Sequence, residues 1–241
     1  MTAPTSISCV IPAWNEASRI AGVLRAAAGH PDLAEVIVVD DCSTDGTAAV
    51  VERFPGVRLV RQPVNGGKSR AVVRGAQEAN GAHLMLLDAD LQGLTPEAVH
   101  RLAAPVLADV ADVSISLRGN APGLWRAIGL DYISGERVLP RERFVEHTDE
   151  ILALPRFGLE VWMNEGWLAA GDRIAVVPWD EVASPYKYAK MGWMRGIMGD
   201  VKMMRDIFRT VSPFEALRQI IAMRRARVPL PSAATRGAEA A

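Results

Sequence analysis

Short apolar runs rich in β-branched residues alternate with helical stretches through the first half of the chain. The pattern predicts strands at residues 6–14, 35–41, 57–62 and 83–90, with helices at 16–28, 44–54 and 68–79 between them. Strands that alternate with helices of about 10 to 15 residues favour a mostly parallel sheet with helices on both faces and right-handed crossovers. The fold class expected is therefore α/β, with a Rossmann-like central sheet.

The second half is less regular. A helix at 96–108, a strand at 111–119, a helix from Gly158 to about residue 171 and a closing strand at 173–182 are expected, whereas 120–156 is weakly periodic and is typical of functional loops. We expect one catalytic-size domain at 1–183, a basic amphipathic helical segment at 184–228 and a disordered tail at 229–241.

Polar side chains follow the ends of several predicted strands. They are Asn15, Glu16, Asp40, Asp41, Lys68, Asp88 and Asp90. Ligands of parallel sheets bind beyond the carboxyl ends of the strands, so these residues are expected to converge on one site.

The run LLDADLQG places Asp88 and Asp90 one residue apart at the end of an apolar strand. Residues that alternate along an extended chain start on one face. Carboxylate and amide oxygens suit Mg²⁺ or Mn²⁺, so Asp88, Asp90 and Gln92 are candidate metal ligands. The alternative is that the aspartates cap the following helix, for which Thr95 and Pro96 are start signals.

The passage VNGGKSRAVVRGAQEA resembles a phosphate-binding loop followed by a helix. The P-loop motif requires glycine where this chain has Gln62, and no G-x-G-x-x-G follows the first strand, so a nucleoside triphosphatase and a dinucleotide oxidoreductase are both disfavoured. A helix amino terminus carrying Lys68, Ser69 and Arg70 still favours phosphate oxygens. A surface helix with a flexible entry is the alternative.

The run VVDDCSTDGT places Asp40 and Asp41 at the end of the second predicted strand. Ser43 or Thr44 is expected to cap the following helix, and Asp45 suits a turn. A buried aspartate here could accept a hydrogen bond from a nucleobase N–H, which would confer specificity.

Composition and charge add three points. The 241 residues contain no apolar run of 18 or more, their amino terminus lacks the pattern of a secretory signal, and the two cysteines lack metal-ligand spacing, so a cytoplasmic protein with reduced thiols is expected. Residues 184–227 carry ten Lys and Arg against three Asp and Glu, a surplus of +7, which leaves −8 on residues 1–183. No nucleic-acid partner is expected, but the basic apolar stripes at 186–227 suit an anionic membrane surface. Packing of these stripes on the domain is the alternative.

PAWNEA, VVDDCSTDGT, NGGKSRA and LLDADLQ stand in the order and spacing of family 2 glycosyltransferases of the GT-A fold, and most resemble the polyprenyl- and dolichyl-phosphate sugar transferases. The resemblance implies a UDP- or GDP-hexose donor and a Mg²⁺ or Mn²⁺ cofactor. It places Pro12, Trp14, Glu16 and Asp41 around the nucleoside with Asp40 beside them, Lys68 at the diphosphate, and Asp88, Asp90 and Gln92 at the metal. Trp14 stands where the family usually has Tyr, and Ser69 replaces a frequent Gly.

For the acceptor, SLRG and DYISGERVLPRE resemble segments of the polyprenyl-phosphate enzymes, which makes Arg118, Arg126 and Ser134 candidates for the acceptor phosphate and Arg137 a looser one. Gly135-Glu136 and FGLE also resemble relatives that glycosylate small acidic acceptors such as phosphoglycerate. An alcohol acceptor would need a base, for which Asp131, Glu136 and Glu160 are candidates.

The hypothesis is a metal-dependent, inverting transfer of a hexose to polyprenyl phosphate at the inner face of the membrane, with Asp90, Lys68, Arg118 and Glu160 as catalytic residues. The alternatives are a hydroxyl acceptor and, less favoured, a sugar nucleotidyltransferase or an inactive binding module.

Overall fold

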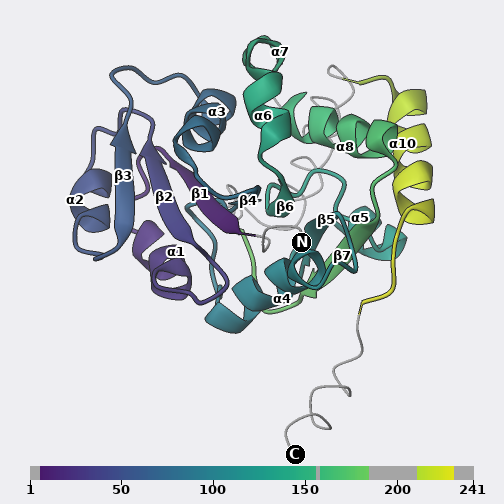
Figure 1. Cartoon of the computed structure of the whole chain (residues 1–241), viewed down its shortest axis with the longest axis horizontal. Helices are drawn as coiled ribbons and strands as arrows, with labels where there is room; N and C mark the ends of the chain where they lie inside the picture. The colour runs from purple at the N-terminus through teal and green to yellow at the C-terminus, as the bar shows by residue number, and fades with distance from the viewer. Residues whose placement is uncertain (1–5, 156–157, 185–210, 231–241) are drawn as a thin grey trace, which may run out of the picture.

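The computed structural model describes residues 6–155, 158–184 and 211–230 (Figure 1). The predictions for most of the basic segment and for the tail beyond residue 230 therefore lie outside the described residues.

The centre of the fold is a seven-stranded sheet in the order β3-β2-β1-β4-β6-β5-β7 (Figure 1). Its strands are β1 (Ile7–Ala13), β2 (Glu35–Asp40), β3 (Val57–Arg61), β4 (His83–Leu86), β5 (Val113–Arg118), β6 (Arg137–Pro140) and β7 (Ile174–Trp179). Only β6 runs antiparallel to its neighbours, and Val10 of β1 pairs with Ile37 on one side and Leu86 on the other. The prediction of a mostly parallel α/β sheet is confirmed.

Helices cover both faces of this sheet. They are α1 (Ile20–Ala27), α2 (Thr47–Val51), α3 (Lys68–Glu78), α4 (Pro96–Leu107), α5 (Gly123–Ile128), α6 (Glu142–Glu146), α7 (Thr148–Leu152), α8 (Gly158–Ala170) and α10 (Pro213–Arg225). The core contains one cluster with α1, α2 and α4 and a second with α3, α5 to α8 and α10.

The two clusters follow from the alternation along the strands. In β1, Val10 joins the α3 cluster, whereas its neighbours Cys9 and Ile11 join the α1 cluster on the opposite face. Gly75 lets α3 approach this sheet closely, because a Cβ there would lie 2.3 Å from Val10 Cγ1. Burial raises the pKa of the Cys9 thiol, as expected for an inert core thiol.

Three local expectations were wrong. β4 ends at Leu86, so Asp88 and Asp90 lie in the turn after the strand rather than on it. Helix α2 begins at Thr47 without a cap from Ser43 or Thr44. Strand β6 lies inside the stretch that had been expected to form loops.

The expectation about the start of α4 was correct. The Thr95 side chain accepts a hydrogen bond from Ala98 N, and Pro96 is the first helical residue. Because Thr95 provides the cap, Asp88 and Asp90 are not needed for it.

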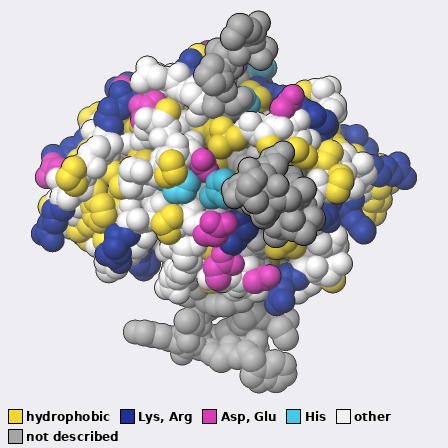
Figure 2. Space-filling model, turned by 60° about the horizontal axis from the view of Figure 1, so that its bottom comes forward, with side chains coloured by type: hydrophobic (Ala, Val, Ile, Leu, Met, Phe, Trp, Pro, Cys, Tyr) yellow, Lys and Arg dark blue, Asp and Glu magenta, His cyan; other side chains and the backbone are white. Residues whose placement is uncertain are grey.

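Charge is unevenly spread over the surface. In the face seen in Figure 2, acidic side chains gather near the middle beside the histidines, and Lys and Arg lie mostly toward the edges. Within the part of the chain that is described, no helix is long and apolar enough to cross a bilayer.

Candidate active site

A pocket of about 760 Å³ opens beyond the carboxyl ends of β1, β2 and β4, between the start of α3 and the start of α8. Nine predicted site residues line it: Pro12, Trp14, Glu16, Asp41, Lys68, Asp88, Asp90, Arg118 and, from α8, Glu160. The volume lies in the range typical of small-molecule sites. Of the seven residues expected to converge from the strand ends, all but Asn15 and Asp40 line this pocket.

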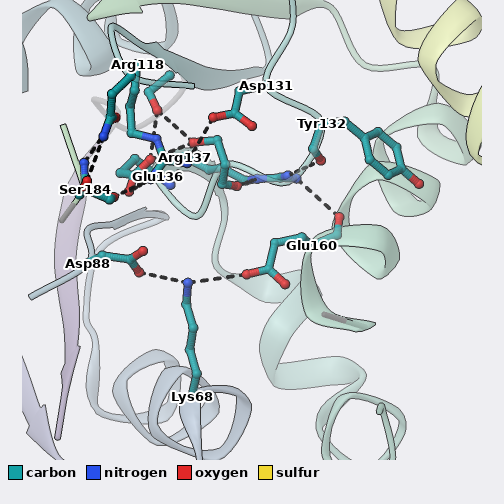
Figure 3. Close-up of polar contacts among 12 residues, drawn as sticks. Lys68, Asp88, Arg118, Asp131, Tyr132, Glu136, Arg137, Glu160 and Ser184 are labelled. Atoms are coloured by element: carbon teal, nitrogen blue, oxygen red, sulfur yellow. Dashed lines mark hydrogen bonds and ion pairs between the residues drawn. The ribbon is translucent and has the colours of Figure 1, made fainter. Parts of the chain in front are cut away.

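Lys68 connects the two sides of the pocket (Figure 3). Its Nζ lies 2.8 Å from Asp88 Oδ1 and 3.3 Å from Glu160 Oε1. Burial alone would lower the pKa of Lys68, but the two carboxylates raise it above its usual value, so the lysine is charged at neutral pH. A Cβ at Gly135 would lie 2.6 Å from this Nζ, so a side chain there would displace the ammonium from its present position.

Asp90 lies in an acidic environment. Burial, together with the nearby carboxylates of Asp88 and Glu16, raises the pKa of Asp90 to about 6. Such surplus negative charge is what a bound divalent cation would neutralise. Among the described residues no group of three His, Cys, Asp or Glu forms a complete cage. The residues therefore fit an ion that takes its other oxygens from a diphosphate and water, as Mg²⁺ commonly does.

Asp41 orders the loop that leads into α3. Its Oδ1 accepts hydrogen bonds from Gln62 Nε2 (2.7 Å) and Gly66 N (2.8 Å), and its Oδ2 accepts one from Gly67 N (2.7 Å). A carboxylate has about four acceptor positions, so Oδ2 retains one for a nucleobase N–H. Asp41 thus orders the loop that positions Lys68, and it can still accept a hydrogen bond from a nucleobase.

The loops after β1 and β2 are held together by the polar run at 43–47. Asn15 adopts a positive φ of 56°, its N donates to Ser43 Oγ, and its side chain accepts from Thr44 N. Asp45 accepts from Ala17 N and from Thr47 N. These contacts fix Trp14 and Glu16 at the pocket, and they explain why the serine and threonine are not helix caps.

Arg118 is bound by two buried carboxylates. Its Nη2 lies 3.0 Å from Asp131 Oδ2 and its Nη1 lies 3.5 Å from Glu136 Oε1 (Figure 3). Burial would lower the pKa of Arg118, but the charges of these two acids raise it. Asp131 Oδ1 is buried and lacks a hydrogen-bond partner, and burial raises the pKa of this carboxyl. The guanidinium is thus already neutralised.

Two other residues predicted to bind the acceptor phosphate lie in the interior. Ser134 is fully buried and donates to Glu136 Oε2 (2.7 Å). Arg137 is fully buried, donates to Ser134 O (2.7 Å) and Asn164 Oδ1 (2.7 Å), and stacks on Trp167 at 4.8 Å. Burial lowers the pKa of Arg137 to about 10. Both side chains make hydrogen bonds within the protein interior, and neither lines the pocket.

The remaining predicted residues are also away from the pocket lining. Arg126 is exposed on α5, and Gln92 is exposed with its backbone paired to Ala183. Asp40 is buried and its Oδ1 accepts from Ser43 N. The structure confirms that Arg70, from the phosphate-favouring start of α3, lines the pocket, and it adds an apolar group that the sequence did not indicate: Ile133, Leu152, Leu154, Pro155 and Leu159. The loop residues among them carry no periodic signal that could have shown this.

Fold and site together are those of an α/β enzyme domain with a small-molecule pocket at the carboxyl ends of parallel strands. The sequence model of glycosyl transferase family 2 matches residues 8–162, and the chain belongs to this family. The family predicted from the four motifs is confirmed, and the fold is that of GT-A glycosyltransferases.

Similar curated proteins include two whose names contain a lipid phosphate. The dolichyl-phosphate beta-glucosyltransferase ALG5C of Trichomonas vaginalis is 38% identical over 94 residues, 34% of this chain and 28% of that protein. The undecaprenyl-phosphate 4-deoxy-4-formamido-L-arabinose transferase of Sodalis glossinidius is 36% identical over 137 residues, 52% of this chain and 41% of that protein. The matches thus span less than half the length of these curated relatives.

A similar solved structure is glucosyl-3-phosphoglycerate synthase from Mycobacterium tuberculosis in complex with Mn²⁺, UDP-glucose and phosphoglyceric acid. It is 25% identical with a TM-score of 0.65, and the match covers 86% of this chain and 79% of that one.

Proposed function

We propose that the protein transfers a hexose from UDP- or GDP-hexose to polyprenyl phosphate, with inversion at the anomeric carbon and with Mg²⁺ or Mn²⁺ as cofactor. The observation that carries the proposal is the joint placement of Lys68, Asp88, Asp90 and Glu160 in one pocket at the strand ends. The similar proteins with dolichyl and undecaprenyl phosphate in their names support the acceptor.

The donor would lie with its nucleoside against Pro12, Trp14 and Asp41 and its diphosphate near Lys68. Asp90, with Asp88 beside it, would hold the divalent ion, which when bound stabilises negative charge on the departing diphosphate. The cation of Lys68 adds to this stabilisation once it exchanges a carboxylate for a phosphate oxygen.

In the reaction, an oxygen of the acceptor phosphate attacks the anomeric carbon and forms a new C–O bond. The bond from that carbon to the diphosphate oxygen breaks, and its electron pair leaves with the nucleoside diphosphate. The acceptor oxygen is already ionised at neutral pH, so no protein base is required. Attack in line with the leaving group inverts the anomeric configuration.

A hydroxyl acceptor is the second candidate. The solved relative contains phosphoglyceric acid, and Glu160 lies in the pocket where it could accept a proton from an alcohol. In that case Glu160 would be a catalytic base, whereas with a phosphate acceptor it only balances the charge of Lys68.

The location we propose is the inner face of the cytoplasmic membrane, with peripheral attachment. On α10, Ala216, Ile220 and Met223 are buried against the domain, whereas Phe214, Leu217 and Ile221 are exposed by 78%, 54% and 43%. Exposed Arg224 and Arg225 follow on the last turn. An apolar stripe with arginines beside it suits an anionic lipid surface.

The donor proposal is tested by thermal shift with UDP- and GDP-sugars, with and without Mn²⁺. A nucleotide sugar that binds only the folded protein raises the melting temperature, and by more the tighter it binds. We expect one nucleotide series to do so only with Mn²⁺. No shift with either series, with or without metal, would contradict the proposal.

A further inference from the structure

Two of the cations that line the pocket are already neutralised by carboxylates. Lys68 contacts Asp88 and Glu160, and Arg118 contacts Asp131 and Glu136. Each cation therefore faces two carboxylates, and the inner pocket keeps a surplus of negative charge. An acceptor phosphate that relied on Arg118 would have to displace a buried carboxylate, which is costly.

Arg70 differs from these cations. It lies in the first turn of α3, is exposed, and lines the same pocket. Its stem folds back over Gly66, where a Cβ would lie 2.2 Å from Arg70 Cδ. Among residues 6–155, 158–184 and 211–230, no hydrogen bond or ion pair engages its guanidinium.

The wall that α7 and the loop after it contribute to this pocket is apolar. Leu152, Leu154 and Pro155 line the pocket from the end of α7 and the loop after it, and α7 packs against α3. Leu152 is 42% exposed although it is a large apolar side chain. The pocket thus offers an unpaired cation on α3 and exposed apolar surface on α7, the helix packed against it.

We propose that Arg70 binds the phosphate of the lipid acceptor and that Leu152, Leu154 and Pro155 receive the first part of its apolar chain. The inference rests on the proposed function and assigns the acceptor subsite within it. A lipid phosphate carries its anion directly on an apolar chain, so its chemistry is complementary to this edge of the pocket. A planar guanidinium can bind phosphate through two parallel hydrogen bonds.

The first test replaces Arg70 and measures KM for each substrate separately, with farnesyl phosphate as acceptor. Arg70→Gln should raise the KM for farnesyl phosphate about 10- to 100-fold, because hydrogen bonds to a charged group are lost. The KM for the nucleotide sugar should stay within about twofold of the unmodified protein's. Arg70→Lys keeps the positive charge but cannot form two parallel hydrogen bonds. Its KM for farnesyl phosphate should therefore lie between that of the unmodified protein and that of Arg70→Gln.

The matched control is Arg74→Gln. Arg74 lies one turn further along α3, pairs with Glu78, and is outside the pocket lining. This variant should leave both KM values unchanged.

The second test concerns the apolar wall. Leu152→Ser should raise the KM for farnesyl phosphate about tenfold, because the first part of the apolar chain loses contact with this wall, and it should leave the KM for the nucleotide sugar unchanged. Val145→Ser is the matched control, since Val145 is 41% exposed on the neighbouring α6 and does not line the pocket.

Isothermal titration with farnesyl phosphate separates failure of this inference from failure of the proposed function. Binding that Arg70→Gln weakens supports the subsite even where no hexose is transferred, and the transfer proposal alone then fails. The inference is overturned if farnesyl phosphate does not bind, if Arg70→Gln leaves its binding unchanged, or if the variant raises only the KM for the nucleotide sugar, which would assign Arg70 to the donor.

Discussion

Asp41 gives the sharpest test of how the loop before Lys68 is held. The carboxylate is 3% exposed and accepts three hydrogen bonds, from Gln62 and from the backbone of Gly66 and Gly67. Asp41→Ala would leave two backbone N–H groups without their acceptor. A hydrogen bond to a charged group contributes about 1.5–3 kcal/mol, and three bonds that order one loop are not additive, so we expect a loss of about 3–5 kcal/mol.

Asp41→Asn should cost less. Its amide oxygen can replace Oδ1 and keep two of the bonds, but its NH₂ group then faces Gly67 N–H, so the expected loss is about 1.5–3 kcal/mol. For a domain of this size, 1 kcal/mol shifts the melting temperature by about 2–4 °C. The melting temperature should therefore fall by about 6–20 °C for the alanine variant and about 3–12 °C for the asparagine variant.

The assay is thermal unfolding followed by circular dichroism in the absence of nucleotide. Asp149→Asn is the control, because Asp149 is exposed in the first turn of α7 and should not alter the melting temperature. If both Asp41 variants melt like the unmodified protein and lose only nucleotide binding, Asp41 acts on the base alone and the reasoning about the loop is wrong.

Three further variants test the site. Asp90→Ala should abolish the Mn²⁺-dependent part of the nucleotide-sugar thermal shift, whereas a retained shift would place the ion elsewhere. Glu160→Gln should slow transfer to polyprenyl phosphate by less than about tenfold, but transfer to phosphoglycerate by about 10²- to 10⁴-fold if that hydroxyl needs a base, and equal losses in kcat would argue against the distinction. Arg137→Met should lower stability by about 3–5 kcal/mol in urea unfolding, because the buried oxygens of Ser134, Tyr132 and Asn164 are left without their donor; a stable variant with a raised acceptor KM would return Arg137 to the acceptor site.

The fold could be predicted because the sequence patterns that indicate its strands and helices lie within short stretches of the chain. Apolar strands that alternate with helices fix a mostly parallel sheet, and Thr95 with Pro96 marks the start of α4. Strand β6 could not be predicted in this way. It is four residues long, and three of them are buried, so it shows no alternation.

The donor side of the site was predictable for the same reason, since polar residues that follow parallel strands meet at one edge of the sheet. The acceptor side was not. Arg137 and Ser134 belong to a segment that resembles a phosphate-binding one, but their burial depends on Trp167, Asn164 and Glu136, contacts that the sequence does not show. The sequence placed Arg70 at a helix start that favours phosphate oxygens, but Arg70 became a candidate for the acceptor phosphate only when the structure showed which cations are paired.

The most direct test of the central claim is a transfer assay with the unmodified protein, labelled UDP- or GDP-hexose, Mn²⁺ and polyprenyl phosphate in detergent. The account predicts that label enters the organic phase as a lipid-linked hexose phosphate of inverted anomeric configuration, with one nucleoside diphosphate released for each hexose transferred and with no transfer when the metal is chelated. Label that remains in the aqueous phase with every donor tested, while phosphoglycerate becomes glycosylated under the same conditions, would contradict it.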